Sequence, residues 1–360
     1  MRQGVLADIV SFANGKSIKP GGQGVYPVFG ANGIIGGSDD SNHEDAIILG
    51  RVGAYCGAVE KSDDRFWASD NTIVVKPKEN NFSKLYTYYL LKFMDLNKFA
   101  GGAAQPLLTQ TTLKQVPIRY HDNEGERDRI GLMLSSYDNL IENNNRRIAI
   151  LEDMAQSLYR EWFVKFRYPG HESQTLIDSP LGPIPEGWEV KRLDDFLVLQ
   201  RGFDLPKKKR NEDGGVPIYA ASGINGYHDQ VKANGPGVVT GRSGTLGIVN
   251  LVQEDYWPLN TSLWVKEFKG CTAYYAYYLL SSIGLERFNS GASVPTLNRN
   301  DVHGHQVIAP PNSLIEEFEG IAEKCVSQIN VLKRKNKNLE QQRDLLLPKL
   351  ISGKINLNGS

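Results

Sequence analysis

The sequence is poor in the features that mark secreted, membrane and metal-binding proteins. Its 360 residues include three cysteines, an odd number without a CxxC pair. A disulfide framework and a cysteine-rich zinc site are therefore disfavoured, and we expect a cytoplasmic protein. No apolar run approaches the roughly 20 residues that cross a bilayer, so no membrane association is predicted. Residues 1–10 also lack the apolar segment of a signal peptide.

An excess of charge of one sign is also missing, since 41 Lys and Arg balance 41 Asp and Glu. This balance argues against a non-specific polycation, but it leaves room for a nucleic-acid binder whose basic groups are concentrated locally. Charged residues at 23% and apolar residues at 40% are typical of a globular chain. The length favours two or three domains over a single core.

Catalytic motifs are present only as fragments. Gly15-Lys16-Ser17 resembles the end of a phosphate-binding loop, but the first glycine of that motif is missing. Ala309-Pro310-Pro311-Asn312 resembles the catalytic loop of adenine methyltransferases without its first amide and its final aromatic residue. His303-Gly304-His305 has no apparent third metal ligand. We therefore expect neither catalytic residues nor a metal site, and no cofactor in this chain.

The sequence repeats one plan at an offset of about 190 residues. Such self-similarity in a fixed order indicates a tandem duplication. The matching segments are 26–36 with 216–226, 50–53 with 241–244, 66–67 with 256–257, 71–72 with 260–261, 86–91 with 275–280, and 102–106 with 291–295.

Each half begins with a segment rich in Gly and Pro, in which short apolar runs such as 46–49 and 72–75 predict strands. Residues 86–93 and 274–280 predict short buried helices. Each half then continues as a long helix. We expect the following parts: a first α+β domain over 1–121, a central long helix over 122–167, a linker over 168–187, a second α+β domain over 188–311, and a C-terminal long helix over 312–355. The linker is rich in Pro and Gly, which disfavours helix and sheet alike.

The two long helices carry apolar residues at steps that alternate between three and four. This spacing predicts a coiled-coil seam, and a polar residue inside a seam costs stability but fixes its register. The predicted fold is therefore α+β, a tandem duplication of a small α/β domain plus a long helix, with the two helices in an antiparallel coiled coil of pseudo-two-fold symmetry. The central seam residues are Ile141, Asn144, Ile148, Leu151, Ile329, Leu332, Asn336 and Leu339.

Candidate DNA-binding residues lie in three kinds of loop. The repeated Gly-Arg pairs supply side chains that can bind guanine or phosphate, although a structural salt bridge is nearly as plausible. Loops 105–110 and 294–299 carry types that suit base edges or ordinary loop capping, and the basic run 207–210 suits phosphates or solvent. The predicted residues are Arg51, Gln105, Thr109, Gln110, Lys207, Lys208, Lys209, Arg210, Arg242, Ser243, Asn298 and Arg299. Each of the two α+β domains is close to neutral, so we expect weak DNA binding by the chain alone and a need for a basic partner.

Three phrases in the sequence carry a resemblance to a known family. They are Pro185-Glu186-Gly187-Trp188 with Leu193-Asp194-Asp195-Phe196, residues 161–166, and residues 347–355. Together with the duplication, they make the chain similar over nearly its whole length to the specificity subunit of a type I restriction-modification system.

This resemblance implies a non-catalytic subunit for defence against foreign DNA. The two α+β domains would be target-recognition domains, and each would bind one half of an asymmetric bipartite site in double-stranded DNA. The two long helices would be spacers, and their coiled coil would set the gap between the half-sites. Two methyltransferase subunits would dock on the chain, and restriction and translocation subunits would join the complex. S-adenosylmethionine, ATP and Mg would be used by those partners. The alternative is a duplicated protein-interaction scaffold without DNA binding, which exposed aromatic residues in the loops would favour.

Overall fold

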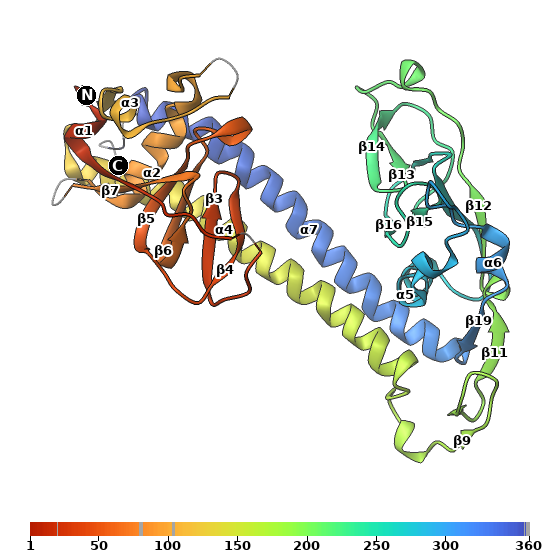
Figure 1. Ribbon diagram of the computed structural model, residues 1–360. Coiled ribbons are helices and arrows are strands. Elements are labelled where there is room, and N and C mark those ends of the chain that lie inside the picture. The colour runs from red at the N-terminus through yellow and green to blue at the C-terminus, as the bar shows by residue number, and fades with distance from the viewer. Residues whose placement is uncertain (20, 79–81, 103–104, 356, 358–360) are drawn as a thin grey trace. The chain divides into compact units, whose positions relative to one another are not determined.

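The computed structural model describes residues 1–19, 21–78, 82–102, 105–355 and 357. The chain divides into two units: unit 1 contains Met1–Asn145 and Lys333–Ser360, and unit 2 contains Arg146–Leu332. Helices α4 (Glu124–Tyr159) and α7 (Asn312–Ile351) each contribute to both units (Figure 1). Each unit is thus an α+β domain with a segment of both long helices.

Unit 1 is built on a six-stranded sheet of order β2-β7-β5-β6-β3-β4, in which β3 and β6 are parallel and the other neighbours antiparallel. A separate ladder joins β1 and β8. The elements are β1 (Arg2–Val5), α1 (Leu6–Ile9), β2 (Val10–Asn14), β3 (Tyr26–Gly30), β4 (Gly33–Ser38), β5 (His43–Gly50), β6 (Val59–Ala68), β7 (Thr72–Pro77), α2 (Lys84–Phe93), α3 (Gln110–Lys114) and β8 (Pro117–Tyr120).

Apolar runs explain the central strands of this sheet. The predicted run 46–49 forms the buried part of β5, which is covered by neighbouring strands on both edges. The run 72–75 likewise lies in β7. Helix α2 begins after Ser83, whose side chain accepts a hydrogen bond from the Tyr86 amide, and it buries Tyr86 and Tyr89 in the core. The predictions for these elements are confirmed.

Unit 2 repeats this plan. Sheet β12-β18-β15-β16 and sheet β14-β13-β17 together match the strand neighbours of unit 1, and β11 pairs with β19 as β1 does with β8. The elements are β11 (Glu189–Arg192), β12 (Leu197–Arg201), β13 (Val216–Ala220), β14 (Gly223–His228), β15 (Gly237–Gly241), β16 (Val249–Val252), β17 (Trp257–Pro258), β18 (Ser262–Phe268), α5 (Ala273–Ile283), α6 (Arg299–His303) and β19 (Gln306–Ala309).

One sequence match is shifted by one residue in the structure. Thr72 pairs with Gly50 in unit 1, and the residue that pairs with Gly241 in unit 2 is Ser262, not Thr261. The Thr72 and Ser262 hydroxyls also donate the same hydrogen bond, 2.7 Å long, to the carbonyl three residues earlier. Identical letters at 260–261 therefore gave the wrong register, because strand pairing follows the backbone rather than side-chain identity. Of the matched segment 102–106, residues 103 and 104 lie outside the described part of the chain.

The segment between the two halves contains a small hairpin. A π-helical turn, η3 (Arg160–Val164), follows α4, and strands β9 (Leu176–Ile177) and β10 (Ile184–Pro185) pair in antiparallel fashion. The expectation that the linker composition excludes sheet is wrong for these four residues. Pro185 is tolerated because the next ladder bond is donated by the Glu186 amide, to the Thr175 carbonyl at 2.8 Å, and not by residue 185.

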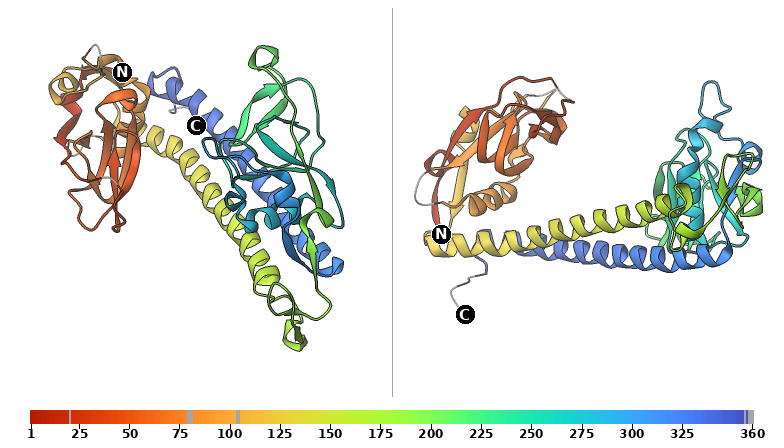
Figure 2. Two further views of the ribbon diagram at one scale, coloured as in Figure 1. Left: turned by 45° about the vertical axis from the view of Figure 1, so that its right-hand side comes forward. Right: turned by 90° about the horizontal axis from the view of Figure 1, so that it is seen from below.

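Both long helices are buried where they cross a domain. In unit 1, Ile130 and Leu134 of α4 and Leu350 of α7 lie in one core with Tyr86. In unit 2, α4 supplies Ala155 and α7 supplies Phe318, Ala322 and other residues to a second core. The two helices lie side by side and run in opposite directions (Figures 1 and 2). Each α+β domain thus uses both helices as part of its own core.

Six of the eight predicted seam residues lie in contacts between the two helices. In unit 1 the Asn144 Nδ2 donates to Asn336 Oδ1 at 2.8 Å, and the Asn336 Nδ2 donates to Asn145 Oδ1 at 2.8 Å. Ile148, Ile329 and Leu332 form a buried cluster in unit 2 against Leu151. Ile141 and Leu339 are half-buried. Because Asn144 and Asn336 satisfy each other, a slip of the seam would leave two amides buried without partners.

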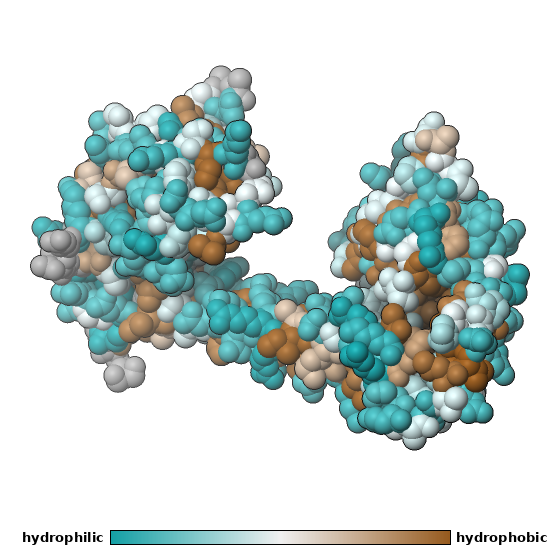
Figure 3. All heavy atoms as spheres, turned by 60° about the horizontal axis from the view of Figure 1, so that its bottom comes forward, coloured by the Kyte–Doolittle hydropathy of each residue, from teal (hydrophilic) through white to brown (hydrophobic). Residues whose placement is uncertain are grey.

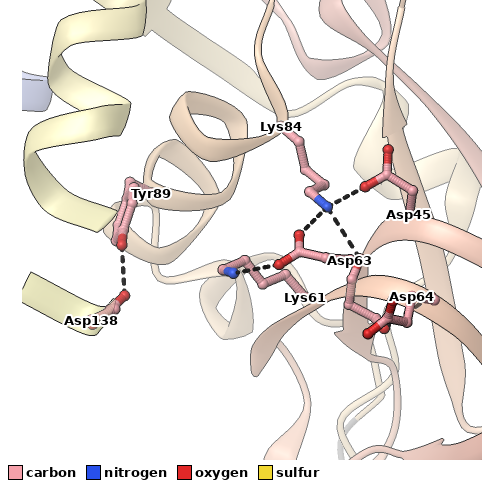
Figure 4. A network of polar contacts seen from close by, with 8 residues as sticks. Asp45, Lys61, Asp63, Asp64, Lys84, Tyr89 and Asp138 are labelled. Atoms are coloured by element: carbon pink, nitrogen blue, oxygen red, sulfur yellow. Dashed lines mark hydrogen bonds and ion pairs between the residues drawn. The ribbon is translucent and has the colours of Figure 1, made fainter. Parts of the chain in front are cut away.

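A second polar network ties α2 to both long helices within unit 1. The Tyr89 hydroxyl donates to Asp138 Oδ2 at 2.6 Å (Figure 4), and the Arg343 guanidinium contacts Asp138 Oδ1 at 2.5 Å. Burial, followed by the bond to Asp138, raises the pKa of Tyr89 far above its ordinary value. The Tyr89 phenol therefore stays neutral and donates this hydrogen bond. Asp138 of α4 thus contacts Tyr89 of α2 and Arg343 of α7.

At the start of α2, Lys84 lies between two carboxylates. Figure 4 shows its ammonium group against Asp45 of β5 and Asp63 of β6. The bond from Lys84 holds the pKa of Asp63 below its usual value of 3.8. This cluster fastens the helix to the two central strands of the sheet.

Replacing Asn336 with Ala should lower the free energy of unfolding by about 1–3 kcal/mol, because the Asn144 amide then remains buried without its partner. The paired change Asn144→Leu with Asn336→Leu should recover this loss, since a matched apolar layer carries no unsatisfied group. Urea denaturation of Asn144→Leu, of Asn336→Leu and of the paired variant gives the double-mutant cycle. Additive effects would contradict a direct contact.

The Lys84 cluster predicts a pH dependence. The pKa of Asp63 is lowered on folding, so its stabilising effect is present above about pH 3.8 and is lost as the pH falls through its lower folded value. Asp63→Asn should reduce the acid sensitivity of the thermal midpoint between about pH 5 and pH 3. Asp64→Asn is the matched control, because Lys84 contacts Asp63 and Asp45. Equal effects of both variants would refute this assignment.

Candidate nucleic-acid interface

The repeated Gly-Arg loops have the same backbone environment in both units. Arg51 follows β5, its amide donates to Asn71 O at 3.0 Å, and its carbonyl accepts from the Leu108 amide at 2.8 Å. Arg242 follows β15 and makes the equivalent bonds to Thr261 O at 2.9 Å and from Leu297 at 2.8 Å. Both arginines are half-buried. The fold therefore presents one arginine in the same way in each domain.

The same bonds bring two predicted loops together. In unit 1 the Gly53 amide donates to Pro106 O at 3.1 Å, and in unit 2 the Gly244 amide donates to Pro295 O at 2.9 Å. Ser243 also forms a β-bridge with Thr296. The Gly-Arg loop and the following polar loop, which sequence reasoning treated separately, are therefore one structural feature in each domain.

In unit 2 these loops surround a hollow of about 470 Å³. Apart from two leucines, its lining is polar or basic, and three arginines approach it from three elements. Arg201 ends β12, Arg242 follows β15 and Arg299 begins α6. The lining residues are Arg201, Arg242, Leu263, Ser290, Thr296, Leu297, Asn298 and Arg299. We call this set the unit 2 site.

The unit 2 site has guanidinium donors of a kind that can bind an anion or a base edge. Arg242 Nη1 donates to Asn260 O at 3.3 Å, which uses one of its five N–H groups. Arg201 lies 3.5 Å from Asp204, and both side chains are more than half exposed. Such an exposed pair is weak. The structural contact of Arg242 is therefore with a carbonyl and not the salt bridge that was the alternative. Its other N–H groups can donate to a ligand.

The equivalent site of unit 1 has a different chemistry. Asn14 ends β2 as Arg201 ends β12, and Gln110 begins α3 as Arg299 begins α6. The Gln110 Nε2 donates to Asn14 Oδ1 at 2.9 Å. Arg51 lies between the strand and helix elements as Arg242 does, and its Nε is buried without a hydrogen-bond partner among the residues that the structure describes. We call Asn14, Arg51 and Gln110 the unit 1 site.

Several predicted residues have a structural role. Thr109 accepts a hydrogen bond from the Thr112 amide at 3.1 Å, and Asn298 accepts one from the Asn300 amide at 3.0 Å, so both cap short helices. Gln105 is exposed in its loop. The capping interpretation therefore accounts for Thr109 and Asn298, and no DNA contact is needed to explain them.

The basic run of unit 2 lies in a loop against β14. Lys207–Lys209 form an exposed 3₁₀ turn, and the Arg210 Nη1 donates to the carbonyl of Asn225 at 2.7 Å and to its side chain at 2.9 Å. Arg210 thus anchors the loop, while the three lysines point to solvent. The corresponding loop of unit 1 carries exposed Lys16 and Lys19.

Sequence reasoning missed Asn14 and Arg201. Both precede a glycine whose amide bonds the sheet in the same way, Gly15 to Thr72 O at 3.3 Å and Gly202 to Ser262 O at 3.1 Å. A Cβ at either glycine would clash with backbone carbonyls, which explains why glycine recurs there. Alignment of the two repeats through these glycines could have identified both residues.

The histidines have local partners. His303 Nε2 accepts a hydrogen bond from the Leu199 amide at 2.9 Å, and burial lowers its pKa. Within the described ranges, we find no cluster of three or more His, Cys, Asp or Glu side chains placed to hold a metal ion. In the same part of the chain, none of the helices is long and apolar enough to cross a membrane.

Comparison with known proteins places this architecture. A family model for the type I restriction modification DNA specificity domain matches residues 4–153 and 185–341. The MjaIX type I restriction enzyme specificity subunit of Methanocaldococcus jannaschii is 28% identical over 306 residues, which is 78% of this chain and 70% of that protein. The EcoprrI specificity subunit of Escherichia coli is 32% identical over 95 residues, or 26% of this chain and 23% of that protein.

The fold has a solved relative. The crystal structure of the type I restriction-modification S subunit from M. genitalium superposes with a TM-score of 0.70 at 18% identity, covering 97% of this chain and 96% of that one. At this identity the likeness concerns the fold, and it agrees with the two matched segments. The chain therefore belongs to the family of type I restriction-modification specificity subunits.

Proposed function

We propose that this chain is the non-catalytic DNA-recognition subunit of a cytoplasmic type I restriction-modification complex, in which each unit binds one half of an asymmetric bipartite site. The observation that carries the proposal is the repeated arginine-centred site with different neighbours in the two units. A shared framework suits a common duplex, and differing side chains suit two different base sequences.

The coiled coil is proposed to set the gap between the half-sites. The Asn144–Asn336 pair fixes the register of the seam, and a helix pair held in one register is a spacer of constant length. At 1.5 Å per residue, the 36 residues of α4 extend about 54 Å. This exceeds one major-groove repeat of about 34–36 Å.

Two methyltransferase subunits are proposed to dock on the chain and to supply both the catalysis and a share of the DNA affinity. The long helices expose apolar side chains that a protein partner could cover, among them Leu140, Ile150, Met154 and Leu345. Figure 3 shows hydrophobic residues interrupting the hydrophilic surface of these helices. S-adenosylmethionine, ATP and Mg would act in the partner subunits, and restriction and translocation subunits would join through the complex.

The scaffold alternative is less well supported. It calls for exposed aromatic side chains at the loops, whereas the unit 2 site is lined by Arg, Asn, Ser and Thr side chains beside two leucines. Co-expression with a methyltransferase subunit and mapping of N6-methyladenine by long-read sequencing tests the proposal. A two-part asymmetric motif with a fixed gap is expected. Assembly without sequence-specific methylation would contradict it.

Arg51→Ala and Arg242→Ala should each lower the rate of methylation about 5- to 50-fold, because each removes a charged contact to DNA. Assembly with the methyltransferase, measured by size-exclusion chromatography, should be unchanged. Arg65→Gln is the control, since Arg65 lies on β6 and pairs with Glu44 at 3.5 Å. Wild-type rates in both alanine variants would show that these arginines do not contact DNA.

A seven-residue heptad inserted into both helices, after Asn145 and before Lys333, should lengthen the gap by about 10 Å, or about three base pairs, and keep the half-site letters. The seam stays in register because the repeat is whole. The same insertion into α4 alone puts the Asn144–Asn336 pair out of register with the Ile148–Leu332 cluster, so one of the two is lost and the thermal midpoint should fall. An unchanged gap in the double insertion would contradict the spacer role.

A further inference from the structure

The two sites differ at equivalent positions and agree at one. The last residue of the first sheet strand is Asn14 in unit 1 and Arg201 in unit 2, and the first residue of the short helix is Gln110 in one and Arg299 in the other. The arginine between them recurs as Arg51 and Arg242. One of the three positions is therefore the same in both units. The other two differ together, with amides in unit 1 and guanidinium groups in unit 2.

This pattern distinguishes contacts to the DNA backbone, which is the same for both domains, from contacts to bases, which differ between the half-sites. A duplex offers both domains the same phosphates, whereas two different half-sites offer different base edges. A side chain kept in both repeats suits the first, and side chains that differ suit the second. The recurring arginine therefore fits a backbone contact, and the changing pair fits base readout.

The chemistry of the changing pair indicates which bases. Arginine binds guanine through O6 and N7, both acceptors, whereas Asn and Gln bind adenine through N7 and the N6 amino group. In unit 1, the Gln110–Asn14 bond uses one donor and one acceptor. The pair keeps the Gln110 carbonyl oxygen as an acceptor and the Asn14 amide nitrogen as a donor, which adenine requires.

In unit 2 the changing pair has donors alone. Arg201 and Arg299 are exposed at the hollow, and neither offers an acceptor. Asp204, 3.5 Å from Arg201, is the acidic group facing it. Because this exposed pair is weak, Asp204 orients the guanidinium without preventing its contact with a base.

We propose that Arg201 and Arg299 of unit 2 recognise guanine, that Asn14 and Gln110 of unit 1 recognise adenine, and that Arg51 and Arg242 hold the DNA backbone. This assignment rests on the proposed function, since it names the bases that each domain would bind. It predicts a guanine requirement in the half-site of unit 2 that depends on the two exchanged positions.

The test converts the unit 2 site to the chemistry of unit 1. The full chain with Arg201→Asn and Arg299→Gln is assembled with the methyltransferase subunit, and its methylation motif is mapped on a randomised duplex library. One half-site should lose a guanine preference, with methylation of the original sequence down about 10- to 100-fold, and the other half-site should keep its letters. Retention of both original half-sites at the wild-type rate would overturn the assignment.

A measurement on the wild-type complex keeps the test independent of how the variant folds. Each guanine of the two half-sites is replaced in turn by 7-deazaguanine, which lacks the N7 acceptor. At least one position in one half-site should lose about tenfold in methylation rate. Full tolerance at every position would overturn the proposal.

Two controls separate this inference from the proposed function. Arg242→Ala should weaken methylation of all sequences alike and leave the letters unchanged, as expected of a phosphate contact. Altered letters in that variant would contradict the division of contacts. Lys191→Gln, an exposed residue that pairs with Glu189, should change neither rate nor letters. A wild-type complex without any sequence-specific motif would contradict the proposed function itself, whereas a bipartite motif that survives the exchange contradicts the base assignment alone.

Discussion

The pairing of α4 with α7 is the constraint on which the rest of the structure depends. Each helix is amphipathic along a single seam, so neither could be buried without the other. The pairing also closes both domain cores, because residues of both helices pack beneath the sheets of unit 1 and unit 2. Asn144 and Asn336 restrict this packing to one register, at the cost of an apolar layer. The long helices are thus part of both domain cores.

The sequence predicted the duplicated α+β plan and the helical seam because both depend on periodicity and order. Ile148 in α4 and Leu332 in α7 each belong to a regular series of apolar residues with alternating steps of three and four. Residues 46–49 form an uninterrupted apolar run. The composition of the linker was a poorer guide, since a two-residue ladder such as β9–β10 depends on local geometry more than on propensity. Identical letters misplaced the match at 260–261, where only strand pairing sets the register.

The candidate sites were less predictable. The arginines at 51 and 242 were identified from the repeat, but their connection to the polar loops is made by backbone bonds such as those from Leu108 and Leu297, which no residue type reveals. Asn14 and Arg201 end strands that lie nearly a hundred residues before Gln110 and Arg299 in the sequence. Side chains that converge from distant segments carry no local pattern, and Thr109 and Asn298 showed that a suitable residue type can equally be a helix cap.

The contribution of α7 to unit 1 has a consequence for the order of folding during synthesis. Unit 2 is one continuous stretch of chain, whereas unit 1 needs Leu350 and Ile351, which are almost completely buried, and the Leu350 carbonyl that contacts His121 Nε2 at 2.7 Å. Domains usually fold in the order in which they leave the ribosome. Unit 1 is synthesised first, but its core is not complete until α7 has emerged as far as residue 351. Until then the apolar side of unit 1 that α7 covers stays exposed. The domain made second is the first that can be completed.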